Sequence, residues 1–325
     1  EEINEVVKVL SSGWITSGPK VAAFEKAFAE YVGSPYALTL TSCTAGLHLA
    51  MEILDLQPGD EVITTSLTWP ATVNMIHLCG GRPVFVDVER NAFNLDVSKL
   101  EEAITKQTRA VVPVHFAGQS CDLDKLSEIC KSHGIELIED AAHAVGSEYK
   151  GKRIGSWDNM AVFSFHPIKN MTTGEGGMIT THNNETFEKL RTLRFHGVDK
   201  DAWKRYGCGD KAGYELYHPG WKYNMTDIQA AIGLVQLERL DTMIEKRMTL
   251  AALYDDLLSE THEITRPGRV PYDIRHAWHL YTILVDKDKA GIGRDEFMQE
   301  MGKRNIGTGL HFQAVHQLSF YKNHY

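Results

Sequence analysis

Lys169 stands in a segment whose residue types suit covalent chemistry on a carbonyl group. It follows the apolar stretch Ala161–Phe165, which predicts a buried strand, and it precedes the flexible, glycine-rich loop 172–177. A lysine on a turn beside a packed sheet is partly removed from water, and burial makes its ammonium group easier to deprotonate. The neutral amine can form a Schiff base with an aldehyde. The alternative is a surface lysine at a strand end, and only the neighbouring motifs favour the catalytic interpretation.

Asp140 ends the segment Ile135–Asp140, whose apolar alternation predicts a strand with two carboxylates at its carboxyl end. Open α/β sheets bind their ligands at this edge. A buried carboxylate needs a cation, and the protonated pyridine nitrogen of pyridoxal 5′-phosphate would serve, because an aspartate partner keeps that ring an electron sink. Alternatively, Asp140 caps a helix that opens at Ala141–His143. The segment alone favours the cap; together with Lys169 it favours the cofactor.

A phosphate site is predicted at the turn Thr41–Gly46, where hydroxyl groups and backbone amides precede the apolar helix Leu47–Leu54. The positive end of a helix dipole and its unpaired amides attract anions. Many helices begin with serine and threonine, so this signal is weak in isolation. Ser164, just before the lysine loop, could add a hydroxyl group.

Lysine, aspartate and phosphate turn together resemble the fold-type I pyridoxal-phosphate enzymes, and the sequence motifs are most similar to those of the DegT-type sugar aminotransferases. The matching strings occur in the family's order along nearly the whole chain. They are Gly13–Pro19, Ser42–Ala45, Pro58–Ile63, Pro113–Gln119, Glu139–His143, the Lys169 loop and Tyr223–Asp227.

Three further segments are most similar to the member of this family that makes UDP-4-amino-4-deoxy-L-arabinose, a C4 aminotransferase of a UDP-4-keto-pentose. They are Phe165–Asn170, His276–Leu280 and Gly307–Phe312. Enzymes that act on UDP-4-keto-6-deoxyhexoses or on GDP-4-keto-6-deoxymannose share many of these motifs, so those substrates remain alternatives.

The resemblance implies roles for the residues around the cofactor ring. Lys169 would hold the cofactor covalently and move the proton between the substrate carbon and the cofactor, and Asp140 would pair with the pyridine nitrogen. His143 would contact the phenolic oxygen, and Trp69 would stack on the ring. Without the resemblance, His143 is an interior histidine bonded to backbone and Trp69 a packing residue.

The resemblance also implies a phosphate-binding set formed by Thr44, Ala45 and Ser164. Asn224 would reach the phosphate of the neighbouring subunit, which would make the enzyme an obligate homodimer with shared active sites. In its local sequence Asn224 is simply part of the turn before a helix that starts at Thr226. His311 is a candidate substrate contact, with an ordinary strand histidine as the alternative.

The implied reaction has two halves. L-glutamate donates its amino group and leaves as 2-oxoglutarate, and the amine is then moved to the C4 ketone of a nucleotide-linked sugar for cell-envelope glycans. Two rival classes remain: dehydratases with the same cofactor, and non-catalytic regulators built on the same fold. Those dehydratases replace the lysine, and a regulator is free to lose the site, whereas this chain retains Lys169, Asp140 and the phosphate turn.

Composition agrees with a soluble, cytoplasmic enzyme that has no membrane or nucleic-acid partner. The chain has 325 residues, 43% of them apolar, and a net charge of −9, which lacks the basic face that nucleic acids require. Five cysteines without a CxxC pair predict reduced thiols. The fifteen histidines form no HExxH motif, so we expect no catalytic metal. Because the chain starts at Glu1 and ends at Tyr325, we expect both termini to be incomplete.

Strand and helix patterns alternate along the first two thirds of the chain. Strands are predicted at 61–65, 83–88, 109–114 and 135–139, and helices at 21–31, from Asp96 to Ile104, and from Asp122. The segment 199–219 is expected to form an exposed or partner-clasping loop. A long helix, Thr226 to about Leu258, would join two domains.

After that helix, strands are predicted at 279–286 and 306–312, with a helix at 294–303 between them. The fold class is therefore α/β: a mostly parallel sheet in a three-layer sandwich, fold-type I, with a smaller C-terminal α+β domain. We assign residues 1–235 to a large cofactor-binding domain with an N-terminal arm, and 236–325 to the small domain.

Overall fold

A seven-stranded sheet forms the centre of the computed structural model, which describes residues 1–198, 216 and 218–325. The strand order is β1-β9-β8-β5-β4-β2-β3, and β9 runs in the opposite direction to the other six strands. The bounds are β1 Tyr36–Leu40, β2 Glu61–Thr65, β3 Arg82–Val86, β4 Thr108–Val112, β5 Glu136–Asp140, β8 Met160–Ser164 and β9 Gly177–Thr181. The mostly parallel sheet is confirmed. The expected loop at 199–219 lies almost entirely outside the described residues.

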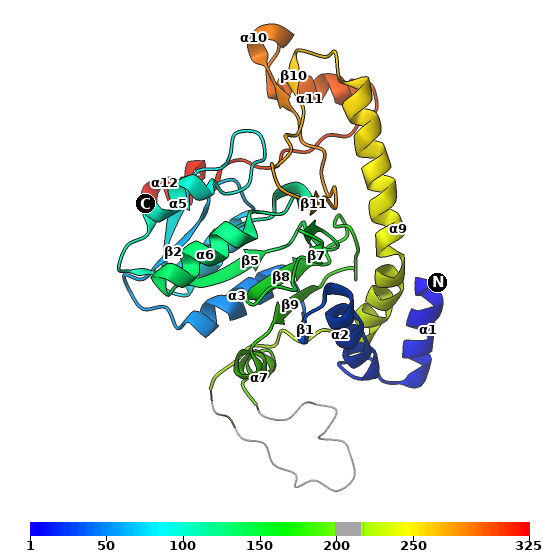
Figure 1. Cartoon of the computed structure of the whole chain (residues 1–325). Coiled ribbons are helices and arrows are strands. Elements are labelled where there is room, and N and C mark those ends of the chain that lie inside the picture. Colours follow the sequence, from blue (N-terminus) through cyan, green and yellow to red (C-terminus); the bar gives the residue numbers. More distant parts are fainter. Residues whose placement is uncertain (199–215, 217) are drawn as a thin grey trace, which may run out of the picture.

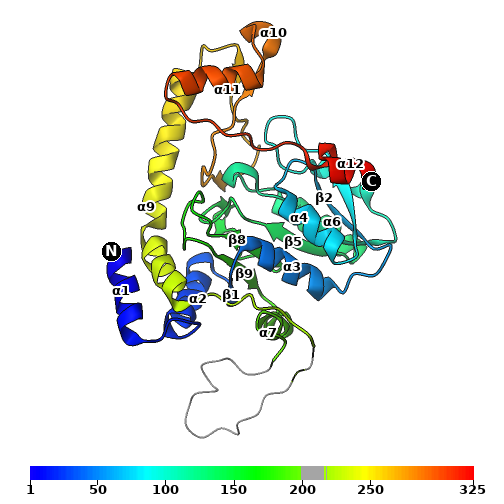
Figure 2. The same ribbon diagram turned by 180° about the vertical axis from the view of Figure 1, so that it is seen from behind.

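Helices cover both faces of the sheet, which gives the three predicted layers (Figures 1 and 2). One apolar cluster joins the sheet to α2 (Pro19–Val32), α6 (Leu123–His133) and α9 (Asp227–Leu257). A second cluster, on the other face, joins it to α3 (Cys43–Leu54), α4 (Pro70–Leu78) and α7 (Asn184–Leu193). All five residues of β2, β8 and β9 are buried, as strands covered on both faces must be.

The long helix α9 starts where its sequence predicts. Thr226 caps it, and Gln229 completes a capping box. The helix runs along one side of the molecule, from α1 (Glu2–Ser12) and α2 toward the C-terminal elements (Figure 1). It crosses the predicted boundary at residues 235 and 236, and the division into two domains stays a prediction.

Asp227, the first residue of α9, ties this helix to α2. Its carboxylate accepts hydrogen bonds from the backbone amides of Gly18, Lys20 and Val21 at 2.8, 3.1 and 2.9 Å. These are amides at the start of α2, which have no partner within their own helix. The strings Gly13–Pro19 and Tyr223–Asp227 therefore form one interlocked structure, although more than 200 positions separate these hydrogen-bonded residues.

Two strand predictions in the C-terminal part are wrong. Within 279–286 only β12 (Leu284–Val285) is a strand, paired with β10 (Ile264–Thr265), because the amides of His279 and Leu280 bond instead to the carbonyl of Ala117. Among the described residues no strand pairs with 306–312, which is largely exposed. The helix α11 (Arg294–Lys303) is confirmed.

The remaining elements are short. The helix expected from Asp96 is a 3-10 turn (Val97–Lys99) followed by α5 (Leu100–Ala103). A small sheet joins β11 (Ile274–Arg275), β6 (Glu148–Tyr149) and β7 (Lys152–Arg153). After α10 (Lys287–Ala290) and α11, the 3-10 turn Val315–Gln317 and α12 (Ser319–His324) pack back against α4. No described helix has the length and apolar character needed to cross a membrane.

Candidate active site

Asp140 and Ser164 end two neighbouring parallel strands, β5 and β8, and so lie at the same edge of the sheet. The Asp140 side chain is buried, with 5% exposed. One carboxylate oxygen accepts a hydrogen bond from the Thr72 hydroxyl at 2.6 Å, and the other accepts one from the Ala142 amide at 3.1 Å. No helix begins at Ala141, so the helix-cap alternative is wrong and Asp140 closes a turn instead.

Lys169 lies on a tight turn after β8, in which its amide donates to the carbonyl of His166. The turn is anchored by the next residue, because the side-chain amide nitrogen of the buried Asn170 donates a hydrogen bond to the carbonyl of Ala277 at 2.8 Å. Burial lowers the pKa of Lys169, and nearby Cys43 and Asp140 act in the opposite direction. The amine is therefore easier to deprotonate than an exposed lysine, as expected from the sequence.

The phosphate turn is a helix N-terminus, as predicted. Ser42 caps α3, and its hydroxyl accepts a hydrogen bond from the Ala45 amide at 3.1 Å. Thr44 is exposed in the first turn and Ala45 is buried. Cys43 points toward the carbonyl of Val162, and burial raises the pKa of its thiol well above the usual value. This thiol is consequently a packing group and not a nucleophile, in agreement with the sequence interpretation.

Gly177 lets the phosphate turn approach the sheet. A Cβ atom at Gly177, the first residue of β9, would lie 2.5 Å from the carbonyl carbon of Ser42 and 2.6 Å from the amide nitrogen of Cys43. Both are backbone atoms that cannot move aside without shifting the start of α3. The helix end is thus held against the strand edge that carries Ser164, because Gly177 pairs with Ser164.

His143 lies beside this edge as a neutral imidazole. Its Nδ1 accepts a hydrogen bond from the Ala117 amide at 3.2 Å, so the ring proton is on Nε2. Burial first, and then Lys169, His279 and His311, hold the pKa of His143 well below its usual value. His143 can therefore donate a hydrogen bond through Nε2 at neutral pH.

Two aromatic side chains, Phe312 and Trp69, lie near His143. Phe312 stacks near His143, with ring centres 5.9 Å apart, and lies 6.0 Å from the ring of Trp69. Trp69 is 64% exposed, which is unusual for a tryptophan and leaves one side of its ring open. The adjacent His311 is half-buried, and burial lowers its pKa.

The sequence alone indicates no role for His279. It is 7% exposed, its ring centre is 4.4 Å from that of His143, and neither ring nitrogen has a hydrogen-bond partner among the described residues. Burial first, and then Lys169, Arg247 and His311, lower its pKa to about 2. A buried imidazole without partners is costly, which marks a place for a polar ligand. The string His276–Leu280 contained this residue, but no periodicity distinguished it.

Asn224 lies next to the phosphate turn, since the Thr41 amide donates to the carbonyl of the adjacent Tyr223 at 2.8 Å. Its side-chain nitrogen donates to the Ser17 hydroxyl at 2.6 Å, and its oxygen accepts from the Lys222 ammonium group at 2.6 Å. One hydrogen of the amide nitrogen remains for a further acceptor.

These groups fit pyridoxal phosphate. The α3 terminus offers backbone amides to an anion, and the Lys169 amine is partly desolvated. The buried Asp140 carboxylate is held by the Thr72 hydroxyl and the Ala142 amide, with no ion-pair partner in contact among the described residues, so it can receive the protonated pyridine nitrogen. The unpartnered His279 indicates that the same region is built around a polar molecule.

Comparisons with known proteins agree with this chemistry. The profile of the DegT/DnrJ/EryC1/StrS aminotransferase family matches residues 1–325. The chain is 47% identical to the spore coat polysaccharide biosynthesis protein SpsC of Bacillus subtilis over 326 residues, which is 100% of this chain and 84% of that protein.

Solved structures give the same result. Spr1654 of Streptococcus pneumoniae, a proposed sugar aminotransferase in its pyridoxamine-phosphate form, superposes with a TM-score of 0.90 at 35% identity, over 99% of this chain and 85% of that one. PseC of Helicobacter pylori, an aminotransferase of pseudoaminic acid biosynthesis, superposes with a TM-score of 0.91 at 31% identity, over 99% and 85%. The chain therefore belongs to the DegT/DnrJ/EryC1/StrS family of sugar aminotransferases, whose cofactor is pyridoxal 5′-phosphate.

Proposed function

We propose that this enzyme transfers the amino group of L-glutamate to the C4 ketone of a nucleotide-linked sugar, a UDP-4-keto-pentose or a close analogue, for cell-envelope glycans. The observation that carries the proposal is the partly desolvated amine of Lys169 beside the buried Asp140 carboxylate and the N-terminus of α3. SpsC and PseC are named for polysaccharide and pseudoaminic acid biosynthesis, which supports a sugar of the cell surface.

Lys169 and Asp140 would carry the chemistry. When bound, the cofactor supplies an electron sink for charge that develops at the carbon losing or gaining a proton. Lys169 would anchor the cofactor covalently and then, once released, move that proton as general base and acid. Asp140 would accept a hydrogen bond from the pyridine nitrogen and keep it protonated. Thr72 would hold the carboxylate in place through its 2.6 Å hydrogen bond.

Thr44, Ala45 and Ser164 would bind the phosphate group, with the amides of the first turn of α3 as additional donors. Asn224 would reach the phosphate site of a second subunit, which makes the enzyme a homodimer with shared active sites. Its spare amide hydrogen supports this role, although the Ser17 and Lys222 contacts fix the side chain within its own chain.

His143 would donate through Nε2 to the phenolic oxygen of the cofactor, and Trp69 would cover the ring. His311 and His279 would contact the substrate, because both lie close enough to Lys169 for its charge to lower their pKa values. With a net charge of −9 on the whole chain, the diphosphate of a nucleotide sugar must be bound by local cationic and amide groups.

GDP-4-keto-6-deoxymannose and UDP-4-keto-6-deoxyhexoses are the alternative substrates. A dehydratase is disfavoured, because the dehydratases with this cofactor replace the lysine that is retained here in a partly desolvated position. A non-catalytic regulator is disfavoured, because it would be free to lose Lys169, Asp140 and the phosphate turn.

A visible spectrum of the purified holoenzyme tests the proposal. L-glutamate should bleach the absorption of the lysine-bound cofactor, and only the correct 4-keto nucleotide sugar in a panel should restore it. Lys169→Ala should abolish turnover yet still bind the cofactor through Asp140 and the phosphate site. Normal turnover by that variant, or a spectrum unaffected by glutamate, would contradict the mechanism.

A further inference from the structure

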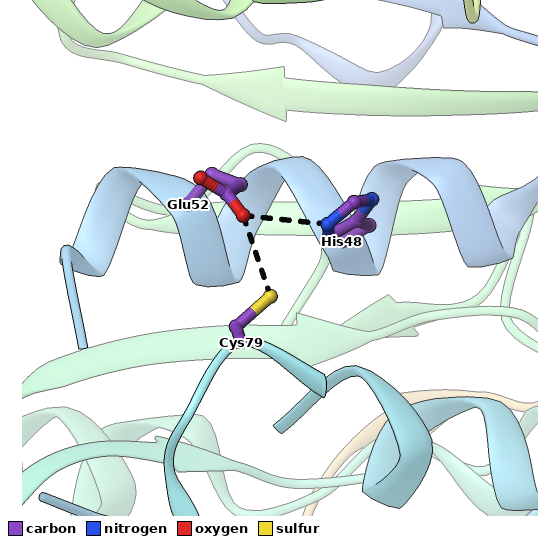
Figure 3. A group of neighbouring side chains, drawn as sticks. All are labelled: His48, Glu52 and Cys79. Atoms are coloured by element: carbon purple, nitrogen blue, oxygen red, sulfur yellow. Dashed lines mark hydrogen bonds and ion pairs between the residues drawn. The ribbon is translucent and has the colours of Figure 1, made fainter. Parts of the chain in front are cut away.

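His48, Glu52 and Cys79 form a cluster of metal-ligand types, and none of the three is among the residues assigned to the cofactor (Figure 3). His48 and Glu52 stand four residues apart on the same face of α3, and Cys79 follows the end of α4. One candidate ligand atom from each residue lies within 4.8 Å of the other two. Imidazole, carboxylate and thiolate are the donors that zinc uses in proteins.

The distances suit a tetrahedral ion. His48 Nε2 lies 3.3 Å from a carboxylate oxygen of Glu52, and that oxygen lies 3.6 Å from Cys79 Sγ. Bonds of about 2.0 Å to nitrogen and oxygen and about 2.3 Å to sulfur place neighbouring ligands roughly 3.3–3.6 Å apart around zinc. The His48 and Cys79 ligand atoms, at most 4.8 Å apart, need to close by no more than about 1.3 Å to complete a three-ligand face.

A second residue prepares the histidine for coordination. The Tyr223 hydroxyl lies 2.9 Å from His48 Nδ1, on the side of the ring away from Glu52. When Nδ1 donates its hydrogen to that hydroxyl oxygen, the lone pair of Nε2 points toward the cluster. Partners of this kind fix the tautomer of histidine ligands in metal sites.

The charge of the cluster also favours a cation. Among the described residues no ammonium or guanidinium group lies within ion-pair distance of Glu52, which meets only His48 and Cys79. The Glu52 and His48 side chains are 32% and 16% exposed, so a water molecule can reach the cluster as a fourth ligand. A carboxylate and a thiolate together would neutralise one divalent ion.

We propose that His48, Glu52 and Cys79 bind one zinc-class divalent cation, which ties the end of α4 to α3. On binding, the Cys79 S–H bond is replaced by a sulfur–metal bond, and the proton is released to solvent. Because the Cys79 thiol must lose its proton to coordinate the ion, affinity should rise with pH. The ion takes no part in transamination.

Cobalt is the probe that reports the ligands. The full-length holoenzyme, treated with a chelator and dialysed, should bind one equivalent of Co²⁺ per chain, with the visible bands of tetrahedral cobalt measured against the same holoenzyme without metal. Zn²⁺ should displace the cobalt and raise the thermal unfolding midpoint. Cys79→Ser and Glu52→Gln should each lose at least about tenfold in affinity, and Tyr223→Phe about ten- to a hundredfold.

Cys130→Ser is the matched control, because Cys130 is a buried thiol on α6 outside the cluster. It should bind cobalt like the wild type, and Cys79→Ser should retain full transaminase activity. Because Glu52→Gln keeps the shape of the side chain, it decides the question if Cys79→Ser folds poorly. No stoichiometric binding, or binding unaffected by these substitutions, would overturn the proposal and leave a cluster in which His48 and Cys79 simply donate hydrogen bonds to Glu52.

Discussion

Burial disfavours the charged forms of several basic side chains of the active site. The pKa values of Lys169, His143 and His279 are all lowered, in each case mainly because the charged form loses its water. Each of these groups is therefore easier to deprotonate than its exposed counterpart, which suits groups that pass protons to and from a substrate. Asp140, by contrast, is an acidic side chain whose buried carboxylate accepts hydrogen bonds from two donors.

His276 gives a prediction for acid stability. Burial, with a contribution from Arg269, lowers its pKa to about 3, whereas an unfolded histidine titrates near its usual 6.5. Below pH 6.5 His276 binds a proton in the unfolded chain but not in the folded chain. The contribution of the neutral His276 to the free energy of unfolding is therefore fully present above that pH and is lost as the pH falls toward 3. This one residue should contribute about 1.4 kcal/mol per pH unit to the loss.

His276→Asn should therefore make the unfolding free energy less dependent on pH between 6 and 5 by about that amount, measured by urea unfolding of the cofactor-free protein. At pH 8 the wild type and the variant should differ only by a constant packing cost. An unchanged slope would show that His276 takes up its proton in the folded protein.

At the scale of elements, the phosphate site depends on the contact between β9 and the start of α3. Gly177→Ala should displace the backbone at Ser42 and Cys43 and raise the dissociation constant for pyridoxal phosphate by at least about tenfold, which is about 1.4 kcal/mol of binding free energy. Fluorescence titration of the cofactor-free protein measures the constant. Gly302→Ala, on α11 with no atom in reach of its new methyl group, is the control and should bind normally. Equal affinities in the two variants would contradict the close approach.

The starts of α9 and α2 provide a second test at this scale. Thr226→Ala removes one helix cap and should cost about 1 kcal/mol of unfolding free energy. Asp227→Ala removes the acceptor of three backbone amides of the other helix, and should cost more, about 2–4 kcal/mol. Urea unfolding of both variants measures the difference. If Thr226→Ala proved the more damaging, the link between the two helices would contribute little.

For the whole molecule, the proposed sharing of active sites can be tested by complementation. Lys169→Ala and Asn224→Ala should each be inactive as homodimers. Co-expressed with different tags, they should form hybrid dimers in which one of the two sites is intact, and random pairing gives about one quarter of wild-type activity. Size-exclusion chromatography checks that both variants form dimers. Two dimeric variants that recover no activity together would place Asn224 in the site of its own subunit.

Local patterns in the sequence were sufficient for the central elements. The alternation of apolar residues predicts β2 to β5 within one or two residues at each end, and the capping residues Asp122 and Thr226 predict the starts of α6 and α9. The same method failed at 279–286 and 306–312. An alternating segment becomes a strand only where a partner strand lies beside it, and the sequence pattern carries no information on that neighbour.

The sequence by itself determined the family, the cofactor and the residue types of the chemistry, because Lys169, Asp140 and the turn before α3 are recognisable from a few adjacent residues each. Only the tertiary structure decided that Gly177 must lack a side chain, that Asp227 caps a helix more than 200 positions away, and that His279 is buried without partners beside His143. The physical reason is the same in each case: burial, desolvation and close contact are properties of neighbours in space, and here those neighbours are far apart along the chain.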